Sequence, residues 1–259
     1  MSKRRVVITG LGIASPVGNG IAQAWDNVVN GRGGIGPITR FDASVLPTRF
    51  AGEVKDFKPE EWMSAKEVRR MDAFIHYGLA ATKMAIDDAG LVVTDSNAER
   101  IGVNVGSGIG GLPMIEDNIR EMIAKGPRRI SPFFVPGSIV NMVAGMISIH
   151  FGMKGPNVSM VSACTTSTHC IGDAARFIEY GDADVMIAGG SEATVCMSGI
   201  GGFCSVKALS ERNDSPATAS RPWDKDRDGF VLGEGAGILV LESYEHATAR
   251  GARIYGELA

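Results

Sequence analysis

Short apolar runs rich in β-branched residues alternate along this chain with longer segments in which apolar residues recur at helical spacing. Runs of the first kind are typical of buried strands, and segments of the second kind are typical of helices. Because parallel strands need helical crossovers, the alternation predicts an α/β sandwich with parallel strand pairing. The predicted strands are 5–10, 48–54, 100–106, 157–162, 183–190, 235–243 and 253–259. The predicted helices are 21–31, 64–90, 114–126, 138–152, 165–181 and 244–251.

The longest predicted helix, 64–90, has distinct start and stop signals and two different faces. Ser64 and Glu67 have the spacing of a capping box, and Gly90 is a helix stop. At helical spacing, one face is built from Val68, Met71, Ile75, Leu79 and Thr82. The opposite face carries the positive charges of Lys66, Arg69 and Arg70. We therefore expect this helix to bury one side and to present a basic surface on the other.

The composition excludes several classes of protein. Hydrophobic residues make up 44% and charged residues 21% of the chain, as in ordinary globular proteins. The net charge of −3 does not favour a nucleic-acid partner. The apolar run at the N-terminus is too short for a signal peptide, and polar residues interrupt every longer apolar stretch. The sequence therefore predicts a cytoplasmic protein of one or two domains, with no membrane partner.

Cysteine and histidine spacing argues against metal binding and disulfides. Thiols stay reduced in the cytoplasm, and the four cysteines form no C-x-x-C pair, so neither a disulfide nor zinc is expected. The histidines, at positions 76, 150, 169 and 246, lack metal-binding spacing. His76, His150 and His246 are predicted to be structural or exposed. The run "DKDRDG" at 224–229 resembles the start of a calcium loop, but Gly235 stands where that loop needs glutamate. We predict no metal, and a local charge network at this run.

Two glycine-rich segments, "GLGIAS" at 10–15 and "GSGIGG" at 106–111, resemble nucleotide-binding loops only in part. Ser15 replaces the third glycine of a dinucleotide fingerprint, and the second segment lacks the Gly-Lys-Ser/Thr ending of a phosphate loop. We therefore predict tight turns and close backbone contacts, and no cofactor. The loops 126–136 and 201–229 are long for a compact domain, which is more typical of functional segments.

Cys164 lies in "VSACTTSTHC", between the predicted strand 157–162 and the predicted helix 165–181. A thiol at such a turn is close to the free N–H groups of the first helical turn and to the positive end of the helix dipole. These conditions favour the reactive thiolate, and the same N–H groups can stabilise an oxyanion. His169 and Cys170 fall on other faces of the helix, so neither is expected to pair with Cys164. The geometry leaves two interpretations open: a nucleophile, or a buried cysteine that packs as a small apolar residue.

Several long motifs resemble one family. The segment "GPNVSMVSACTTSTHCI" is similar to the active-site signature of the β-ketoacyl synthases, and the resemblance is greatest to the synthases II of bacterial fatty-acid synthesis. The other motifs that resemble this family, in family order, are "GSGIGG", "RRISPFFVPGSIVNM", "YGDADVMIAGGSE" and "RPWDKDRDGFVLGEGAG". The resemblance extends from residue 4 to residue 259.

The resemblance implies a thiolase-like layered α/β/α/β/α fold of two related halves, of which this chain supplies mainly the N-terminal half. Residues 1–251 would form the N-terminal synthase domain, and 252–259 the first strand of a truncated C-terminal domain. Cys164 would take an acyl chain from acyl-carrier protein as a thioester. Decarboxylation of malonyl-carrier protein would then give a carbanion that attacks this thioester in a Claisen condensation, giving β-ketoacyl-carrier protein.

The resemblance also implies roles for other residues. Ile109, Phe134 and Phe203 would line or gate the acyl tunnel. A basic surface would bind the acidic carrier protein, and the protein would work as a homodimer. The residues of that surface are Lys66, Arg69, Arg70, Arg128, Arg129 and Lys207.

The chain departs from the family in one respect. In the family, two catalytic histidines and a lysine lie in the second half, and none of the four histidines here occupies a matching motif. We therefore expect the 259-residue chain to be inactive in condensation. The alternatives are a polyketide-type synthase, a thiolase relative, or a non-catalytic dimerising partner. The last alternative is disfavoured because such partners lack the nucleophilic cysteine.

Overall fold

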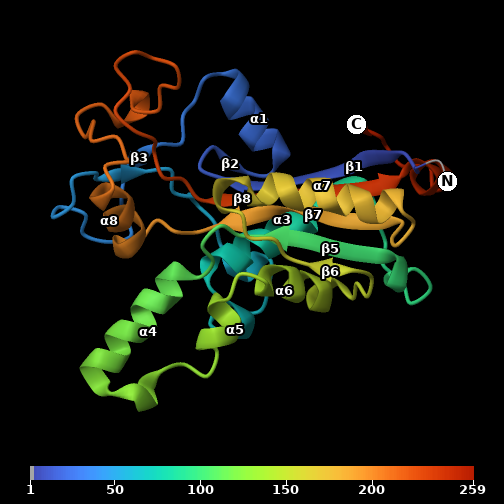
Figure 1. Cartoon of the computed structure of the whole chain (residues 1–259), viewed down its shortest axis with the longest axis horizontal. Coiled ribbons are helices and arrows are strands. Elements are labelled where there is room, and N and C mark those ends of the chain that lie inside the picture. Colours follow the sequence, from blue (N-terminus) through green and yellow to red (C-terminus); the bar gives the residue numbers. More distant parts are fainter. Residues whose placement is uncertain (1–2) are drawn as a thin grey trace.

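The computed structural model describes residues 3–259, and Figure 1 shows them as one layered body. The strands are β1 (Val6–Ser15), β2 (Gly18–Asn19), β3 (Gly36–Pro37), β4 (Phe50–Ala51), β5 (Ile101–Gly106), β6 (Asn157–Val158), β7 (Val185–Glu192), β8 (Gly235–Ser243) and β9 (Gly256–Leu258). The helices are α1 (Ile21–Val29), α2 (Ala65–Val68), α3 (Ala73–Ala89), α4 (Leu112–Lys125), α5 (Phe134–Ser138), α6 (Met142–Phe151), α7 (Thr166–Glu179), α8 (Met197–Ser205) and α9 (Tyr244–Ala249).

The main sheet is mixed, so the expectation of parallel pairing is only partly correct. Its strand order is β2-β1-β8-β7-β5-β6, and β9 pairs with β1. Strand β5 is parallel to β6 and β7, whereas β8 is antiparallel to both β7 and β1. The register places Glu192, at the end of β7, opposite Gly235, at the start of β8. The chain between them leaves and re-enters the sheet at the same end, and for this reason the two strands run in opposite directions.

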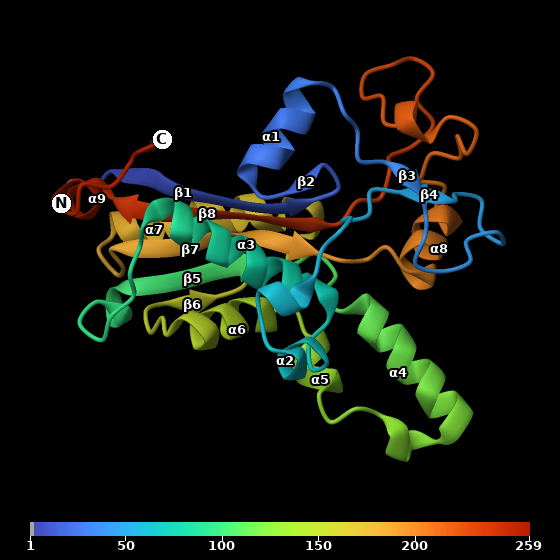
Figure 2. The ribbon, with the colours of Figure 1, turned by 180° about the vertical axis from the view of Figure 1, so that it is seen from behind.

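Helices cover both faces of the sheet. Helices α3 and α6 pack on one face, and α7 packs on the other (Figures 1 and 2). Strand β7 is buried on both sides: Val185 and Ile187 belong to the core under α3, while Met186 and Ala188 belong to the core under α7. This alternation follows from the two-residue period of a strand. The result is a helix–sheet–helix sandwich.

Glycines in β1 let the α3 backbone lie directly on the sheet. A Cβ atom added to Gly12 would lie 1.9 Å from the carbonyl oxygen of Ala81, and one added to Gly10 would lie 2.2 Å from that of Ala85. Only hydrogen fits in this space, because real side-chain carbons do not approach backbone oxygens so closely. The small residues of α3 and the glycines of β1 together set the distance between these layers.

The predicted helix 64–90 is two helices, α2 and α3, so this prediction is wrong at residues 69–72. The side chain of Asp72 caps α3 by accepting from the backbone N–H of Phe74. Its other oxygen accepts from the N–H of Met114 at 2.8 Å, which ties this break to α4. Burial raises the pKa of Asp72 to about 6, although the hydrogen bonds from Met114 and Phe74 oppose the rise. A buried capping carboxylate thus starts a new helix where the apolar pattern alone continues.

The predicted ends of this segment are confirmed. Ser64 and Glu67 form a capping box, and Gly90 closes α3 in the left-handed conformation at φ 58°. Helix α3 is buried on more than the one predicted face, because His76 and Tyr77 are buried as well. His76 Nε2 is hydrogen-bonded to the carbonyl oxygen of Val68.

Several other predicted elements are shorter or displaced. The predicted strands 48–54 and 157–162 each contain a strand of only two residues, β4 and β6. The predicted loop 201–229 begins inside α8, so Cys204 is helical. Cys196 is the N-cap of that helix. Strand β9 lies within 252–259 and pairs with β1 of the main sheet, while the domain boundary at 251 stays a prediction. Among residues 3–259, no helix combines the length and the apolar character needed to cross a membrane.

Candidate active site

Cys164 lies in a 3-10 turn, Ala163–Thr165, immediately before α7. The residue before it, Ala163, has a left-handed backbone with φ 54°. A residue other than glycine in this conformation is strained, and such strain is concentrated at functional sites. The turn leaves Cys164 exposed rather than buried. The structure therefore excludes the buried alternative, and the role of Cys164 as a nucleophile stays a prediction.

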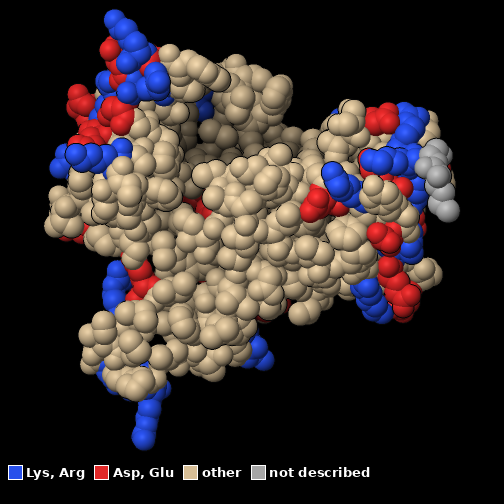
Figure 3. All heavy atoms as spheres, in the orientation of Figure 1, with Lys and Arg blue, Asp and Glu red and all other residues tan. Residues whose placement is uncertain are grey.

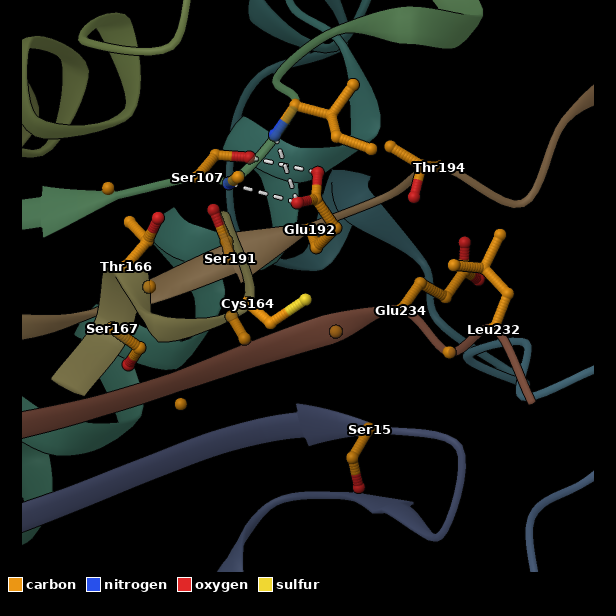
Figure 4. A pocket seen from close by; sticks show the side chains of 18 of the residues that line it. Ser15, Ser107, Cys164, Thr166, Ser167, Ser191, Glu192, Thr194, Leu232 and Glu234 are labelled. Carbon is orange, nitrogen blue, oxygen red and sulfur yellow. Dashed lines mark hydrogen bonds between the residues drawn. The ribbon is translucent and has the colours of Figure 1, made fainter. Parts of the chain in front are cut away.

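The thiol opens into a cavity of about 640 Å³, which we call the Cys164 cavity. Figure 4 shows the side chains that surround it. It lies at the ends of β5 and β7, where the loop after β5, the turn before α7 and the segment at the start of β8 meet. Most of its lining is apolar side chains and backbone, which suits an acyl chain more than a charged ligand.

The predicted acyl-pocket residues are only partly brought together. Ile109 and Phe203 line the Cys164 cavity. Phe203 packs edge to face on Phe230, another lining residue, with ring centroids 5.2 Å apart. Phe134 lies half-buried on α5 and is not among the residues that line the cavity. Its role in gating stays a prediction.

No histidine of residues 3–259 lines the Cys164 cavity. His169 Nδ1 is 2.6 Å from Ser162 Oγ, and His246 Nδ1 is 2.6 Å from Glu242 Oε2. His150 lies beside Glu67, and His76 is buried. His169 is therefore engaged elsewhere, as expected from its position round the helix, and each histidine has a structural or surface contact.

The other cysteines differ from Cys164. Cys170 and Cys196 are buried, and burial raises the pKa of both thiols, that of Cys196 to about 11. Cys204 is half-buried in α8. These three thiols suit structural roles.

The described part of the chain contains no cluster of three or more potential metal ligands. The aspartates of the 224–229 run form local contacts instead: Asp228 pairs with Arg212 and Asp224 with Arg221. This is the charge network expected from the sequence.

Glu192 is a site residue that sequence reasoning missed. It ends β7, lines the Cys164 cavity, and accepts hydrogen bonds from the Ser107 hydroxyl and from the backbone N–H groups of Gly108 and Ile109 (Figure 4). Burial raises the pKa of this carboxyl, although the three hydrogen bonds oppose the rise. The available signal was an acidic residue at the end of a buried strand, in a chain with a glycine-rich loop after another strand.

Glu234 is a second missed residue, at the start of β8. Its buried carboxylate forms an ion pair with Arg40 and accepts from the N–H of Val54 at 2.8 Å and from the Tyr77 hydroxyl. These contacts tie the long segment between α1 and α2 to the wall of the Cys164 cavity. Sequence reasoning had no local signal for this network, because the partners are far apart along the chain.

The six predicted basic residues lie around α2, α4 and α8. Figure 2 shows α2, α4 and α5 along the lower side of the molecule, and Figure 3 shows positive side chains projecting beside α4. Arg70 stacks on Phe133, with the guanidinium carbon 4.3 Å from the ring centroid. The other five are exposed, and none of the six forms an ion pair within residues 3–259. They are Lys66, Arg69, Arg70, Arg128, Arg129 and Lys207.

Fold and site together define a class of protein. A mixed sheet covered by helices on both faces, with an exposed cysteine on a strained turn before a helix, is the thiolase-like arrangement expected from the sequence. The sequence profile described as "Beta-ketoacyl synthase, N-terminal domain" matches residues 3–247. The chain belongs to the β-ketoacyl synthase family.

Individual relatives agree with this assignment. The chain is 58% identical over 258 residues to a 3-oxoacyl-[acyl-carrier-protein] synthase 2 of Vibrio harveyi, covering 100% of this chain and 62% of that protein. It superimposes on the ishigamide ketosynthase/chain length factor with a TM-score of 0.89 and 35% identity, covering 99% and 62% of the two chains. It also superimposes on AntDE:AntF, a type II PKS acyl-carrier protein in complex with its ketosynthase, with a TM-score of 0.87 and 34% identity over the same shares. The chain thus spans about 62% of the length of each of these three relatives.

Proposed function

We propose that this chain is the nucleophile-bearing part of a β-ketoacyl-acyl-carrier-protein synthase of fatty-acid synthesis. The observation that carries the proposal is the exposed Cys164 on a strained turn at the start of α7, open to an apolar cavity of about 640 Å³. The 58% identity to a 3-oxoacyl-[acyl-carrier-protein] synthase 2, against 34% to a type II PKS ketosynthase, favours fatty-acid over polyketide synthesis.

In the first half-reaction, the Cys164 thiolate attacks the thioester carbonyl of acyl-carrier protein. A bond forms between Sγ and the carbonyl carbon, and the carrier thiolate leaves and takes up the proton released by Cys164. The positive end of the α7 dipole stabilises the oxyanion of the tetrahedral intermediate. The acyl chain then lies in the Cys164 cavity, beside Ile109 and Phe203.

The second half-reaction, decarboxylation of malonyl-carrier protein and Claisen condensation, needs groups that stabilise an enolate. The histidines at 76, 150, 169 and 246 all lie away from the cavity. We therefore expect the 259-residue chain to accept an acyl group without condensing it.

The test is to incubate the purified chain with acyl-carrier protein and then with malonyl-carrier protein. Intact mass followed by peptide mapping is expected to find one acyl group, on Cys164. Chromatography is expected to find no β-ketoacyl product. Formation of that product by the pure chain would contradict the expectation that it accepts an acyl group without condensing it. Failure of Cys164 to become acylated under any condition would contradict the proposed function.

We propose acyl-carrier protein as the partner of the basic residues around α2, α4 and α8. Five of these residues are exposed, and none of the six is neutralised by an ion pair within residues 3–259. Unpaired surface charges attract an acidic partner and orient its approach more than they tighten the complex. A structural neighbour, the type II PKS acyl-carrier protein in complex with its ketosynthase, supports this assignment.

Reversing two of these charges is expected to slow acylation. The double variant Lys66→Glu and Arg69→Glu should lower the second-order rate of acyl transfer about tenfold at low ionic strength. The difference should shrink in high salt, because salt screens exposed charges. The matched control, Arg176→Glu, changes an exposed charge in the last turn of α7 and should leave the rate within about twofold. Equal effects of both variants would argue against a specific docking surface.

We propose a homodimer in the cytoplasm as the working form. Strand β6 lies at one edge of the main sheet and exposes Val158, and Ile149 on the adjoining α6 is also exposed. An unpaired strand edge with exposed apolar neighbours suits pairing with a second copy. All four cysteines are free, a state that the reducing cytoplasm preserves.

Competition between acyl-carrier protein and acyl-coenzyme A as acyl donors would distinguish a synthase from a thiolase relative.

A further inference from the structure

The loop after β5 is held by one buried carboxylate. Glu192 Oε1 accepts from the Ser107 hydroxyl at 3.0 Å, and Oε2 accepts from the N–H groups of Gly108 and Ile109 at 3.0 and 3.1 Å. The Ser107 oxygen in turn accepts from the N–H of Gly110 at 3.0 Å. Three donors on one carboxylate, with Ser107 as a link, fix residues 107–110, which we call the cavity loop, as a unit.

The cavity loop adjoins both the Cys164 cavity and the turn that carries Cys164. Ile109 lines the Cys164 cavity. A Cβ atom added to Gly108 would lie 2.8 Å from Glu192 Oε2 and 3.2 Å from the carbonyl oxygen of Ala163, so the loop is pressed between the carboxylate and the turn that carries Cys164. Figure 4 shows Glu192 on the same side of the cavity as Ser107, facing the loop.

Just after the cavity loop, the chain is held by a backbone hydrogen bond rather than by a side chain. Gly111 N–H donates to the carbonyl oxygen of Ser138 on α5, and Gly110 has a left-handed backbone with φ 81°. Glycines at 108, 110 and 111 give the loop little stiffness of its own, because glycine has the widest choice of backbone conformations. The position of Ile109 therefore depends on the Glu192 hydrogen bonds.

We propose that Glu192 is a positioning residue that sets which acyl chain lengths fit beside Cys164, by holding the cavity loop and with it Ile109. This inference rests on the proposed function, since it assumes that the Cys164 cavity receives an acyl chain. Glu192 acts on the loop and takes no part in bond making at the thioester.

The test measures fit in the cavity without requiring acyl transfer. The full chain is alkylated with iodoacetamide and with N-octyl iodoacetamide. In both reactions a bond forms between Cys164 Sγ and the reagent carbon, and iodide leaves. The ratio of the two second-order rates reports how well the cavity accepts an apolar chain. In the unmodified protein we expect the long reagent to be faster by about tenfold, from the apolar surface that it buries.

Glu192→Ala should lower this ratio about tenfold, because it removes three hydrogen bonds to a charged acceptor and frees the cavity loop. Glu192→Gln should restore most of the ratio, since its amide oxygen can still accept from Gly108 and Ile109. The matched control is Glu53→Ala, which removes another buried carboxylate that accepts two hydrogen bonds from Thr39 and does not line the cavity. Its ratio should equal that of the unmodified protein.

The outcomes separate the two proposals. A normal ratio in Glu192→Ala, with the long reagent favoured in the unmodified protein, overturns the role of Glu192 and leaves the proposed function intact. No preference for the long reagent in the unmodified protein counts against the acyl cavity and therefore against both. If Glu192→Ala does not fold, Ser107→Ala removes one of the three hydrogen bonds, and its ratio should fall about threefold; an unchanged ratio there overturns the inference.

Discussion

Replacing Cys164 with alanine is expected to lower acyl transfer by a factor of about 10³ or more and to abolish the covalent acyl adduct. The sulfur is the only atom of this side chain that can form the thioester. Binding of the acyl chain without it therefore leads to no product. The measurement is intact mass after incubation with acyl-carrier protein, together with the rate of carrier thiol release. Because Cys164 is exposed, the substitution should leave the melting temperature within about 2 °C.

The other thiols serve as controls for this prediction. Cys204→Ala changes a half-buried thiol in α8 and should keep the adduct, whose site peptide mapping would place at Cys164. Iodoacetamide at neutral pH should label Cys164 first, because Cys170 and Cys196 are buried and burial raises their pKa values. An adduct that persists in Cys164→Ala, or equal slow labelling of all four thiols, would refute the nucleophile assignment.

The largest expected effect on stability comes from Gly12. The Cβ atom of Gly12→Ala would lie 1.9 Å from the carbonyl oxygen of Ala81 and 2.8 Å from the backbone nitrogen of Ala85. Both are backbone atoms of α3, so the helix must shift away from the sheet. We expect a loss of about 3 kcal/mol in the free energy of unfolding, which is a large share of the total for a domain. Denaturant titration, with the yield of folded protein as a second measure, would test this.

A glycine in open space provides the matched control. Gly172 lies in the middle of α7, and no atom beyond the adjoining backbone of that helix lies within 4 Å of a Cβ added there. Gly172→Ala should therefore raise the stability by about 0.5–1 kcal/mol, because alanine favours the helix and restricts the unfolded chain. A Gly12→Ala variant as stable as the parent protein would show that α3 can move away from β1 at little cost.

Helix and strand identity was predicted well where the signal is local, and poorly where it depends on distant residues. Strand β8 has its predicted bounds, 235–243, because alternation and flanking glycines mark it within the sequence itself. The predicted helix 64–90 is interrupted before Ala73 because the Asp72 carboxylate accepts from Met114, a residue 42 positions away. The antiparallel pairing of β7 and β8 depends on where a connection of more than forty residues returns, which periodicity does not report.

The same difference between local and long-range signals applies to the active site. Cys164 could be singled out because its chemistry depends on neighbours along the chain: a turn, a helix start and small residues. Glu192 gave only a weak signal, its place at the end of a buried strand, because its partners on the cavity loop are 83–85 positions away. Glu234 gave none, because it accepts from Val54 across 180 positions. The sequence does not show which hydrogen-bond donors will surround a buried carboxylate.

By itself, the sequence determined the α/β character of the chain and the family, and it singled out Cys164 as the candidate nucleophile, because all three depend on short-range patterns and motifs. The tertiary structure decided the mixed sheet, the break between α2 and α3, and the grouping of Cys164, Ile109 and Glu192 around one cavity. The physical reason is that burial and hydrogen bonding of polar groups arise between segments that meet only after the sheet has formed. The proposed control of chain length by Glu192 depends on contacts between these segments, and no single segment encodes it.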